Sequence, residues 1–254
     1  MRDFHRRLAS AIVALGLAIG AAGSARADGL AISPMHVNLS ATDHVGSVAL
    51  TNQNDTPLRL EVAGFHWAQR TDGSAILEPS ESLIVFPLLL TIPAHQARNV
   101  RLALTAAPAE REDAYQVSIT ELPSFTSPAN RGVRFTFRMR ANLAVFFAPN
   151  VTRSGASIAS AAVHAGALTF VLANGGNVHF VAKDLSVSGL DAAQHLVFSQ
   201  TLDRSDVLAE DKRFYRIPLS RKTCSDLRAL TIRANAGDRA LVETLAVQPG
   251  ACKT

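Results

Sequence analysis

Cysteine is scarce in this sequence, and that scarcity narrows the chemistry the chain can carry. The 254 residues include two cysteines, Cys224 and Cys252, both near the C-terminus. They lack the C-x-x-C spacing of a redox motif, and no cluster of histidines lies near them to complete a zinc site. The sequence therefore disfavours a redox pair or a metal site at these positions, and it implies no cofactor.

Catalytic motifs are missing as well. The sequence has no G-x-S-x-G elbow, P-loop, H-E-x-x-H helix or paired-carboxylate signature. The histidines that follow the first 27 residues are scattered, and none lies at ligand spacing from another. An enzyme on this chain would need a site assembled from residues far apart in the sequence, so a protein without catalytic activity is favoured.

Long hydrophobic runs are confined to the N-terminus. The most apolar later stretch, Leu83–Ile92, is about half of the ~20 residues that a membrane-spanning helix needs, and Pro87 interrupts it. At the N-terminus, three arginines precede an apolar stretch that ends in the small-x-small site Ala25–Ala27. Residues 1–27 are therefore predicted to be a secretory signal peptide, and the mature chain is expected to be exported without membrane insertion.

The mature chain has almost no excess of positive or negative charge. Without residues 1–27, 21 Lys and Arg face 20 Asp and Glu, which leaves a net charge near +1 and little reason to expect a nucleic-acid partner. Export also bears on the cysteines, because two thiols in an oxidising compartment most simply form a disulfide. A Cys224–Cys252 bridge is predicted, and it would constrain the unfolded chain by roughly 3–4 kcal/mol.

Short strands and turns follow one another along the mature chain. Turn clusters such as Asn52–Asp55 and Thr71–Ser74 separate segments with alternating or β-branched residues, and no long amphipathic helix is evident. The pattern predicts an all-β protein of two sandwich domains, residues 28–150 and 151–254. The expected strands are Leu30–Leu39, Ser47–Thr51, Leu58–Phe65, Asn99–Leu104, Tyr115–Leu122, Leu168–Leu172, Val178–Val187, Leu196–Leu202, Phe214–Leu219, Leu230–Ala234 and Leu241–Val247.

The segment Gly132–Pro149 combines two different faces. As a β-strand it is apolar on one side and basic on the other, since alternate side chains point to opposite faces. Such bulky apolar residues suit either an ordinary half-buried strand or a strand that another protein covers. The apolar set is Val133, Phe135, Phe137 and Met139, and Arg134, Arg138 and Arg140 lie on the other side.

Several segments, in this order, resemble a known family. They are ISPMHVNLS, VALTNQND, VFPLLLTIPAHQARNVRL, AYQVSITELP, the strand that ends in Phe-Phe-Ala-Pro, and NGGNVHF in the second half. Together they are similar to the PapD-like periplasmic chaperones of the chaperone–usher pilus pathway, and to the divergent archaic or spore-coat-type branch in particular.

The resemblance implies two immunoglobulin-like sandwiches joined at an angle, with a cleft between them. It also implies a periplasmic chaperone that lends an edge strand to pilus, fimbrial or spore-coat-like subunits and delivers them to an outer-membrane usher. Strand addition of this kind gains affinity from main-chain hydrogen bonds and specificity from alternating side chains. Val133, Phe135, Phe137 and Met139 are then expected to bind the subunit.

One part of the family pattern is altered. Well-studied members hold the subunit's C-terminal carboxylate with an Arg and a Lys in the cleft, but His36 and Ala144 stand at those positions, and Ala148 replaces a family Arg. Glu112 matches a family acidic position. Because a carboxylate needs cationic donors, the anchor candidates are Arg101, Arg140 and Arg138, with His36 assisting when it is protonated.

Two other classes of protein remain as alternatives. A pilus subunit or secreted adhesin would normally show an incomplete sandwich and an N-terminal donor extension, whereas this sequence predicts one complete domain followed by a second. A secreted enzyme on a β scaffold is opposed by the missing motifs. A chaperone with such an apolar edge could also cap itself by dimerising when no client is bound.

Overall fold

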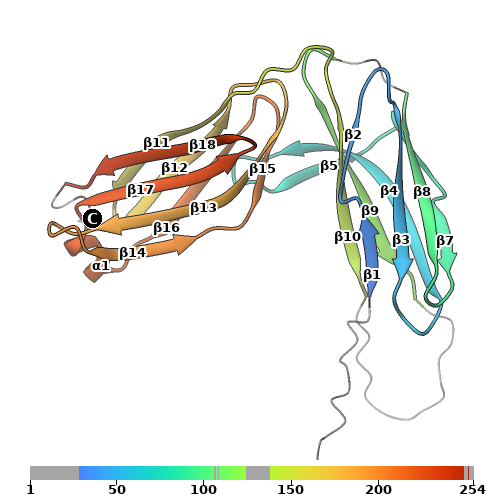
Figure 1. Ribbon diagram of the computed structural model, residues 1–254, viewed down its shortest axis with the longest axis horizontal. Helices are drawn as coiled ribbons and strands as arrows, with labels where there is room; N and C mark the ends of the chain where they lie inside the picture. Colours follow the sequence, from blue (N-terminus) through green and yellow to red (C-terminus); the bar gives the residue numbers. More distant parts are fainter. Residues whose placement is uncertain (1–28, 106, 108, 124–137, 249–250, 252–254) are drawn as a thin grey trace, which may run out of the picture.

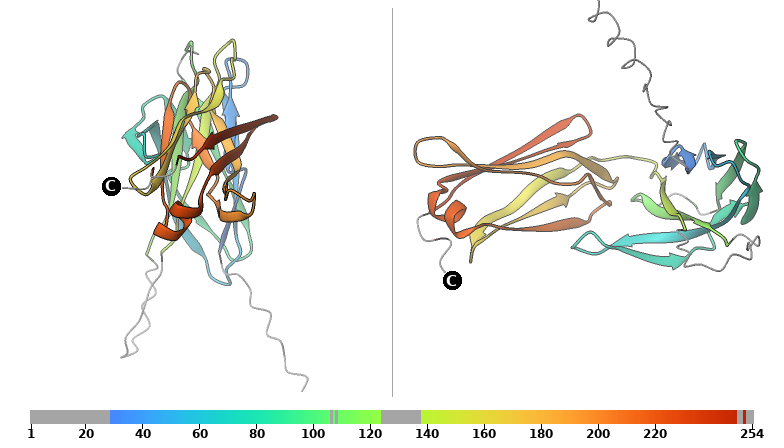
Figure 2. Two further views of the ribbon diagram at one scale, coloured as in Figure 1. Left: turned by 90° about the vertical axis from the view of Figure 1, so that its left-hand side faces the viewer. Right: turned by 90° about the horizontal axis from the view of Figure 1, so that it is seen from below.

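The chain folds into two β-sandwiches that meet at an angle (Figures 1 and 2). The structure is a computed structural model, and it describes residues 29–105, 107, 109–123, 138–248 and 251. The expectation of an all-β protein is confirmed, with one short helix, α1 (Arg221–Asp226), among the described elements. In the part of the chain that the structure describes, no helix is long and apolar enough to span a membrane.

The first sandwich contains two sheets. Its four-stranded sheet has the order β1-β3-β8-β6, and its six-stranded sheet has the order β2-β10-β9-β4-β5, with β7 also paired to β4. The strands are β1 (Leu30–Ser33), β2 (His36–Leu39), β3 (Val45–Asn52), β4 (Leu58–Gln69), β5 (Ala75–Pro79), β6 (Leu83–Phe86), β7 (Leu89–Ile92), β8 (Ala97–Leu104), β9 (Asp113–Glu121) and β10 (Arg140–Phe147).

The second sandwich is built in the same way from a three-stranded sheet, β11-β12-β16, and a five-stranded sheet, β14-β13-β17-β18, in which β15 also pairs with β13. The proposed domain boundary at residue 150 falls between β10 and β11. The strands are β11 (Ala156–His164), β12 (Ala167–Asn174), β13 (Phe180–Leu190), β14 (Leu196–Thr201), β15 (Ser205–Val207), β16 (Lys212–Pro218), β17 (Ala229–Ala236) and β18 (Arg239–Ala246).

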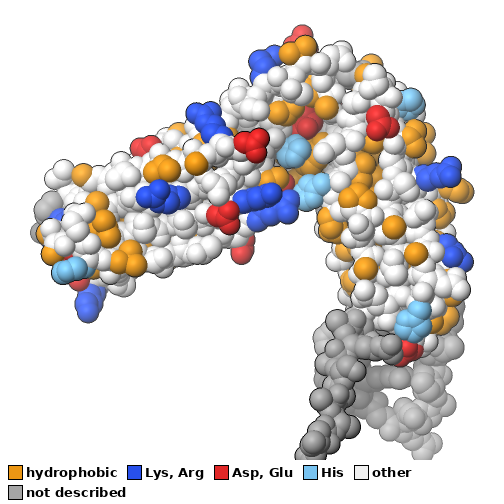
Figure 3. Space-filling model, in the orientation of Figure 1, with side chains coloured by type: hydrophobic (Ala, Val, Ile, Leu, Met, Phe, Trp, Pro, Cys, Tyr) orange, Lys and Arg blue, Asp and Glu red, His pale blue; other side chains and the backbone are white. Residues whose placement is uncertain are grey.

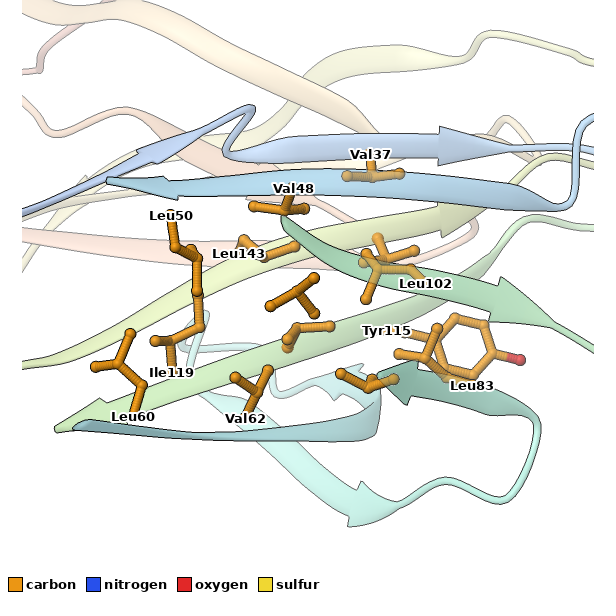
Figure 4. Close-up of a cluster of buried hydrophobic side chains, with 14 of the residues drawn as sticks. Val37, Val48, Leu50, Leu60, Val62, Leu83, Leu102, Tyr115, Ile119 and Leu143 are labelled. Carbon is orange, nitrogen blue, oxygen red and sulfur yellow. The ribbon is translucent and has the colours of Figure 1, made fainter. Parts of the chain in front are cut away.

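Each sandwich encloses its own hydrophobic core. In the first, alternate residues of facing strands, such as Leu50 on β3, Leu60 on β4 and Leu143 on β10, point inward and are almost fully buried (Figure 4). Alternation along a strand produces this arrangement, because it sends every second side chain into the space between the two sheets. Leu143, Val145 and Phe147 of β10 therefore belong to the core, and its even-numbered residues point away from it.

A buried asparagine ends one strand of each sandwich and holds the neighbouring loops. The Asn52 side-chain nitrogen donates to the carbonyls of Thr56, Ile92 and Pro93. The side-chain nitrogen of Asn174 makes three equivalent bonds, to Val178, Val207 and Leu208. Since buried backbone carbonyls need partners, these two amides satisfy groups that the sheets leave unpaired.

One predicted strand is wrong. Leu30–Leu39 was expected as a single strand, but it forms two: β1 pairs with β3 in one sheet, and β2 pairs in parallel with β10 in the other. Pro34 lies between them, and it has no backbone N–H to donate to a ladder. The crossing from one sheet to the other places Met35 and His36 at the edge of β10, where the cleft between the domains begins.

Candidate functional site: an open strand edge and the interdomain cleft

Strand β10 has one paired edge and one that is partly open. On one side β9 pairs with it over its whole length, from Arg140 to Phe147. On the other side β2 covers only residues 144–147, and among the described strands none pairs with residues 140–143 there. Four residues of β10 therefore present an unpaired edge, directly after the segment 124–137, which lies outside the described residues.

The direction of the main-chain groups shows which residues serve that edge. The N–H groups of Ala144 and Ala148 donate toward β2, to Met35 and Leu39, whereas the carbonyl of Met139 accepts from Glu121 on the β9 side. Successive residues of a strand direct their main-chain groups to opposite sides. The N–H and C=O groups of Arg140 and Asn142 therefore point to the open edge.

A cavity of about 160 Å³ lies at the point where the open edge ends and β2 begins. Most of its lining comes from the first domain, and Asp206 comes from the second. Figure 3 shows histidine, acidic and basic side chains gathered on the concave face between the two sandwiches. The cavity is lined by Met35, His36, Trp67, Gln116, Asn142, Leu143, Ala144 and Asp206.

Polar groups from both domains meet at this cavity. The Arg204 guanidinium, in the turn before β15, lies 3.0 Å from His36 Nε2. Because arginine can only donate, that nitrogen accepts and His36 is neutral in this arrangement. Asp206 Oδ1 lies 3.8 Å from the same nitrogen, and it is buried without a hydrogen bond, as is the indole Nε1–H of Trp67.

Next to the cavity, a buried contact joins the two domains. The Glu112 carboxylate, 6% exposed, accepts bonds of 2.7 Å from both the backbone N–H and Nδ1 of His179. The Phe146 ring of β10 stacks on the His179 ring with their centroids 3.5 Å apart. Phe146 also packs with Leu208 of the second domain. We call Glu112, His179 and Phe146 the interdomain latch.

The hairpin between β4 and β5 makes a second bridge to the other domain. The Phe214 N–H donates to the Thr71 carbonyl, and the Gln69 side chain donates to the Asp206 carbonyl. Gly73, with φ at +87°, lets the hairpin tip approach the Arg213 guanidinium, since a Cβ there would lie 2.3 Å from Arg213 Cζ. The latch and the hairpin together fix the position of the second domain beside the cavity.

The predicted site residues are only partly brought together. His36 lines the cavity and is paired with Ala144 across β2 and β10, so the two altered family positions lie side by side. Arg140 begins β10, where its Nε donates to Ser118 Oγ, and Arg138 precedes the strand with its side chain exposed. Arg101 lies on β8, in the other sheet, paired across from Phe86 and Ser47, so the structure does not bring it to His36.

Of the four predicted subunit-binding residues, the structure describes one, Met139. Val133, Phe135 and Phe137 lie outside the described residues. Met139 is partly exposed, and its main chain is tied to Glu121 on β9. The alternation predicted for this segment continues through β10, where Asn142 is exposed and Leu143 is buried.

The chain is similar to known proteins both in sequence and in fold. Residues 29–152 match the model of the family described as pili and flagellar-assembly chaperones, PapD N-terminal domain. The first domain of the chain belongs to the pilus-assembly chaperone family. The chaperones of this family are non-enzymatic. No curated protein sequence matches the chain.

Solved structures of pilus chaperones and their complexes share its fold. A chain of the CsuC–CsuE chaperone–tip adhesion subunit complex from archaic Csu pili of Acinetobacter baumannii is 17% identical, with a TM-score of 0.59, over 85% of this chain and 97% of that one. For a chain of the Salmonella enterica complex of SafA pilin with the SafB chaperone, the identity is 15% and the TM-score 0.57, over 86% of this chain and 97% of that one. For the E. coli chaperone DraB, the identity is 12% and the TM-score 0.53, over 85% of this chain and 98% of that one.

Sequence reasoning missed the second-domain part of this chaperone's cleft. Arg204 and Asp206 lie about 170 residues beyond His36 in the sequence and belong to a turn and a three-residue strand. No motif marks them. Trp67, the one tryptophan of the chain, was the single available signal, since a lone large aromatic on an outward face often serves an interface.

Proposed function

We propose that this chaperone binds pilus or fimbrial subunits by adding the edge of β10, and the segment leading into it, to the subunit's incomplete sheet. The observation that carries the proposal is the unpaired edge of residues 140–143. An exposed strand edge invites pairing with another chain, and natural proteins normally shorten, cover or charge such an edge. Here the edge is continuous with the bulky alternating residues Val133, Phe135, Phe137 and Met139, which would fill the subunit's groove.

The end of the open edge favours one orientation for the bound strand. A strand added beside residues 140–143 meets the start of β2, at Met35 and His36, where the cavity lies. If it ran parallel to β10, as β2 does, its C-terminus would enter the cavity. The anchor for a C-terminal carboxylate is therefore proposed at the cavity, with His36 beside it and Arg140 along the approach. Arg138 is further from it, and Arg101, on the other sheet, becomes the weakest of the four candidates.

Export and delivery complete the proposal. Residues 1–27 would direct the chain to the periplasm, where the family works, and an outer-membrane usher would receive the loaded subunit. Without a client, two copies could pair their β10 edges and protect each other.

The direct test is co-expression in the periplasm with a pilus subunit encoded beside this protein, followed by purification through a tag on the chaperone. A 1:1 complex supports the proposal. An Asn142→Pro variant removes one N–H from the open edge while leaving the β9 ladder intact, so it should fold and capture less subunit. A matched Leu143→Pro variant removes a ladder bond and a core side chain and should fail to fold. Equal capture by wild type and Asn142→Pro would argue against edge pairing.

A further inference from the structure

The residues predicted from the sequence to anchor the subunit's carboxylate place no permanent cation in the cavity. His36 is neutral where Arg204 donates to it, and the even-numbered outward positions of β10 nearest the cavity are Asn142 and Ala144. Arg140 is held by Ser118 at the far end of the strand. The guanidinium that touches a cavity-lining residue is that of Arg204, from the second domain.

The polar groups that line the cavity include several that can donate hydrogen bonds. Trp67 contributes an indole N–H that is buried and unpartnered, and Gln116 and Asn142 contribute side-chain amides. In the described part of the chain Arg204 makes one hydrogen bond, to His36, so most of its five N–H groups remain available. The Arg204 guanidinium is exposed and lies beside His36, a lining residue, so it can reach an anion that enters the cavity. A carboxylate can accept two parallel bonds from its planar fork.

We propose that Arg204 is the cation that binds the client's terminal carboxylate, so that the anchor of this chaperone spans both domains. The inference rests on the proposed function for the identity of the ligand, but its site is defined by the cleft itself. Trp67 Nε1–H is a second donor to the same carboxylate, and neutral His36 orients the guanidinium through its Nε2. Binding then depends on the latch and the hairpin that hold the second domain in place.

Asp206 provides a second test, because its replacement should change carboxylate binding in the opposite direction to the replacement of Arg204. Its Oδ1 is buried, accepts no hydrogen bond in the described structure and lies 3.8 Å from His36 Nε2. A carboxylate entering the cavity would meet this second negative charge, which opposes binding. Replacing Asp206 by Asn removes the charge and keeps the shape, so this variant should bind a carboxylate more tightly, whereas Arg204→Ala should bind it more weakly.

The single tryptophan makes the site observable without a client. The chain has one Trp, so a ¹⁵N-labelled sample gives one indole N–H resonance, from the cavity itself. N-acetylalanine, which mimics a chain terminus, should shift this resonance on titration, and N-acetylalanine amide should not. In Arg204→Ala the affinity should fall about tenfold or more, as expected for the loss of a charge-assisted partner. The exposed Arg216→Ala is the matched control and should behave as wild type.

The outcomes separate this inference from the proposed function. An unchanged titration in Arg204→Ala, an equal response to the amide, or no response to either probe would overturn the role of Arg204, even if wild type still captured subunits. A carboxylate-specific shift that Arg204→Ala abolishes and Asp206→Asn strengthens would support it. Failure of the wild type to capture any subunit, with that shift intact, would contradict the proposed function while leaving the anion site standing.

Discussion

Removing the Glu112 carboxylate should release the second domain from the first. The carboxylate is 6% exposed and accepts two bonds of 2.7 Å from His179, whose ring also stacks on Phe146. Hydrogen bonds to a charged group contribute about 1.5–3 kcal/mol each, and breaking a buried pair by removing one partner costs about 3–5 kcal/mol. Glu112→Ala should therefore cost about 3–5 kcal/mol of the free energy that docks the domains.

The loss should appear in the coupling between the domains more than in either core, because each sandwich has a core of its own. We expect calorimetry of Glu112→Ala to separate into two unfolding transitions, and small-angle scattering to show a larger radius of gyration. The matched control is Glu210→Ala, which removes a second interdomain ion pair, with Arg111 at 3.8 Å, whose side chains are more than half exposed. An exposed pair of this kind contributes at most about 1 kcal/mol. If both variants behave alike, the latch does not hold the domains.

Three further predictions address other parts of the chain. Phe135→Ser and Phe137→Ser should leave the melting temperature near that of wild type while at least one loses the co-purifying subunit, with Arg134→Ser as the control; unfolding of both Phe variants would mean that they belong to this protein's own core. Thiol labelling of native and denatured protein without reductant should find no free cysteine, and two labelled thiols would disprove the bridge. Burial raises the pKa of the Asp211 carboxyl, with Arg111 partly opposing the rise, so the folded state disfavours the ionised form and stability falls as pH rises through that pKa. Asp211→Asn should therefore raise the melting temperature at neutral pH and lose this gain in acid. A gain that is equal at both pH values would refute the argument.

The structure describes one of the two cysteines, Cys224. Cys224 is buried on α1 and is not a free thiol. Cys252 lies outside the described residues, so the pairing stays a prediction. The location is consistent with a structural role, because Cys224 packs into the core of the second sandwich.

Alternation predicted most of the strands that line the cores, but it missed the short strands β6, β7 and β15, which contribute Leu83, Ile92 and Val207. In β10, the buried Leu143 and Val145 and the exposed Arg140 and Asn142 follow the expected parity, because a sandwich strand must direct one face inward. Strand β11 was not predicted. It is rich in Ala and Ser, and it contains a register irregularity between Ala159 and Ala162, so its apolar pattern is weak. Pattern fails where the side chains are small and the ladder is uneven.

The cleft could not be predicted in the same way. On its first-domain side, the resemblance drew attention to His36 and Ala144 from the sequence, and the register of β2 and β10 pairs these two residues. The second-domain side depends on how two separate sandwiches dock, and the contacts that determine it, from Glu112 to His179 and from Arg204 to His36, join residues 67 and 168 positions apart. No local pattern encodes such a distance, and only tertiary structure brings these groups together.

Hydrogen exchange along β10 tests the central claim most directly. The main-chain N–H groups of Arg140 and Asn142 face the open edge, whereas those of Ala141 and Leu143 face β9. In the free chaperone the first two amides should exchange quickly and the other two slowly. On binding a subunit, Arg140 and Asn142 should become protected while Ala141 and Leu143 change little. A stable chaperone–subunit complex in which Arg140 and Asn142 still exchange as fast as in the free protein would contradict strand addition at this edge.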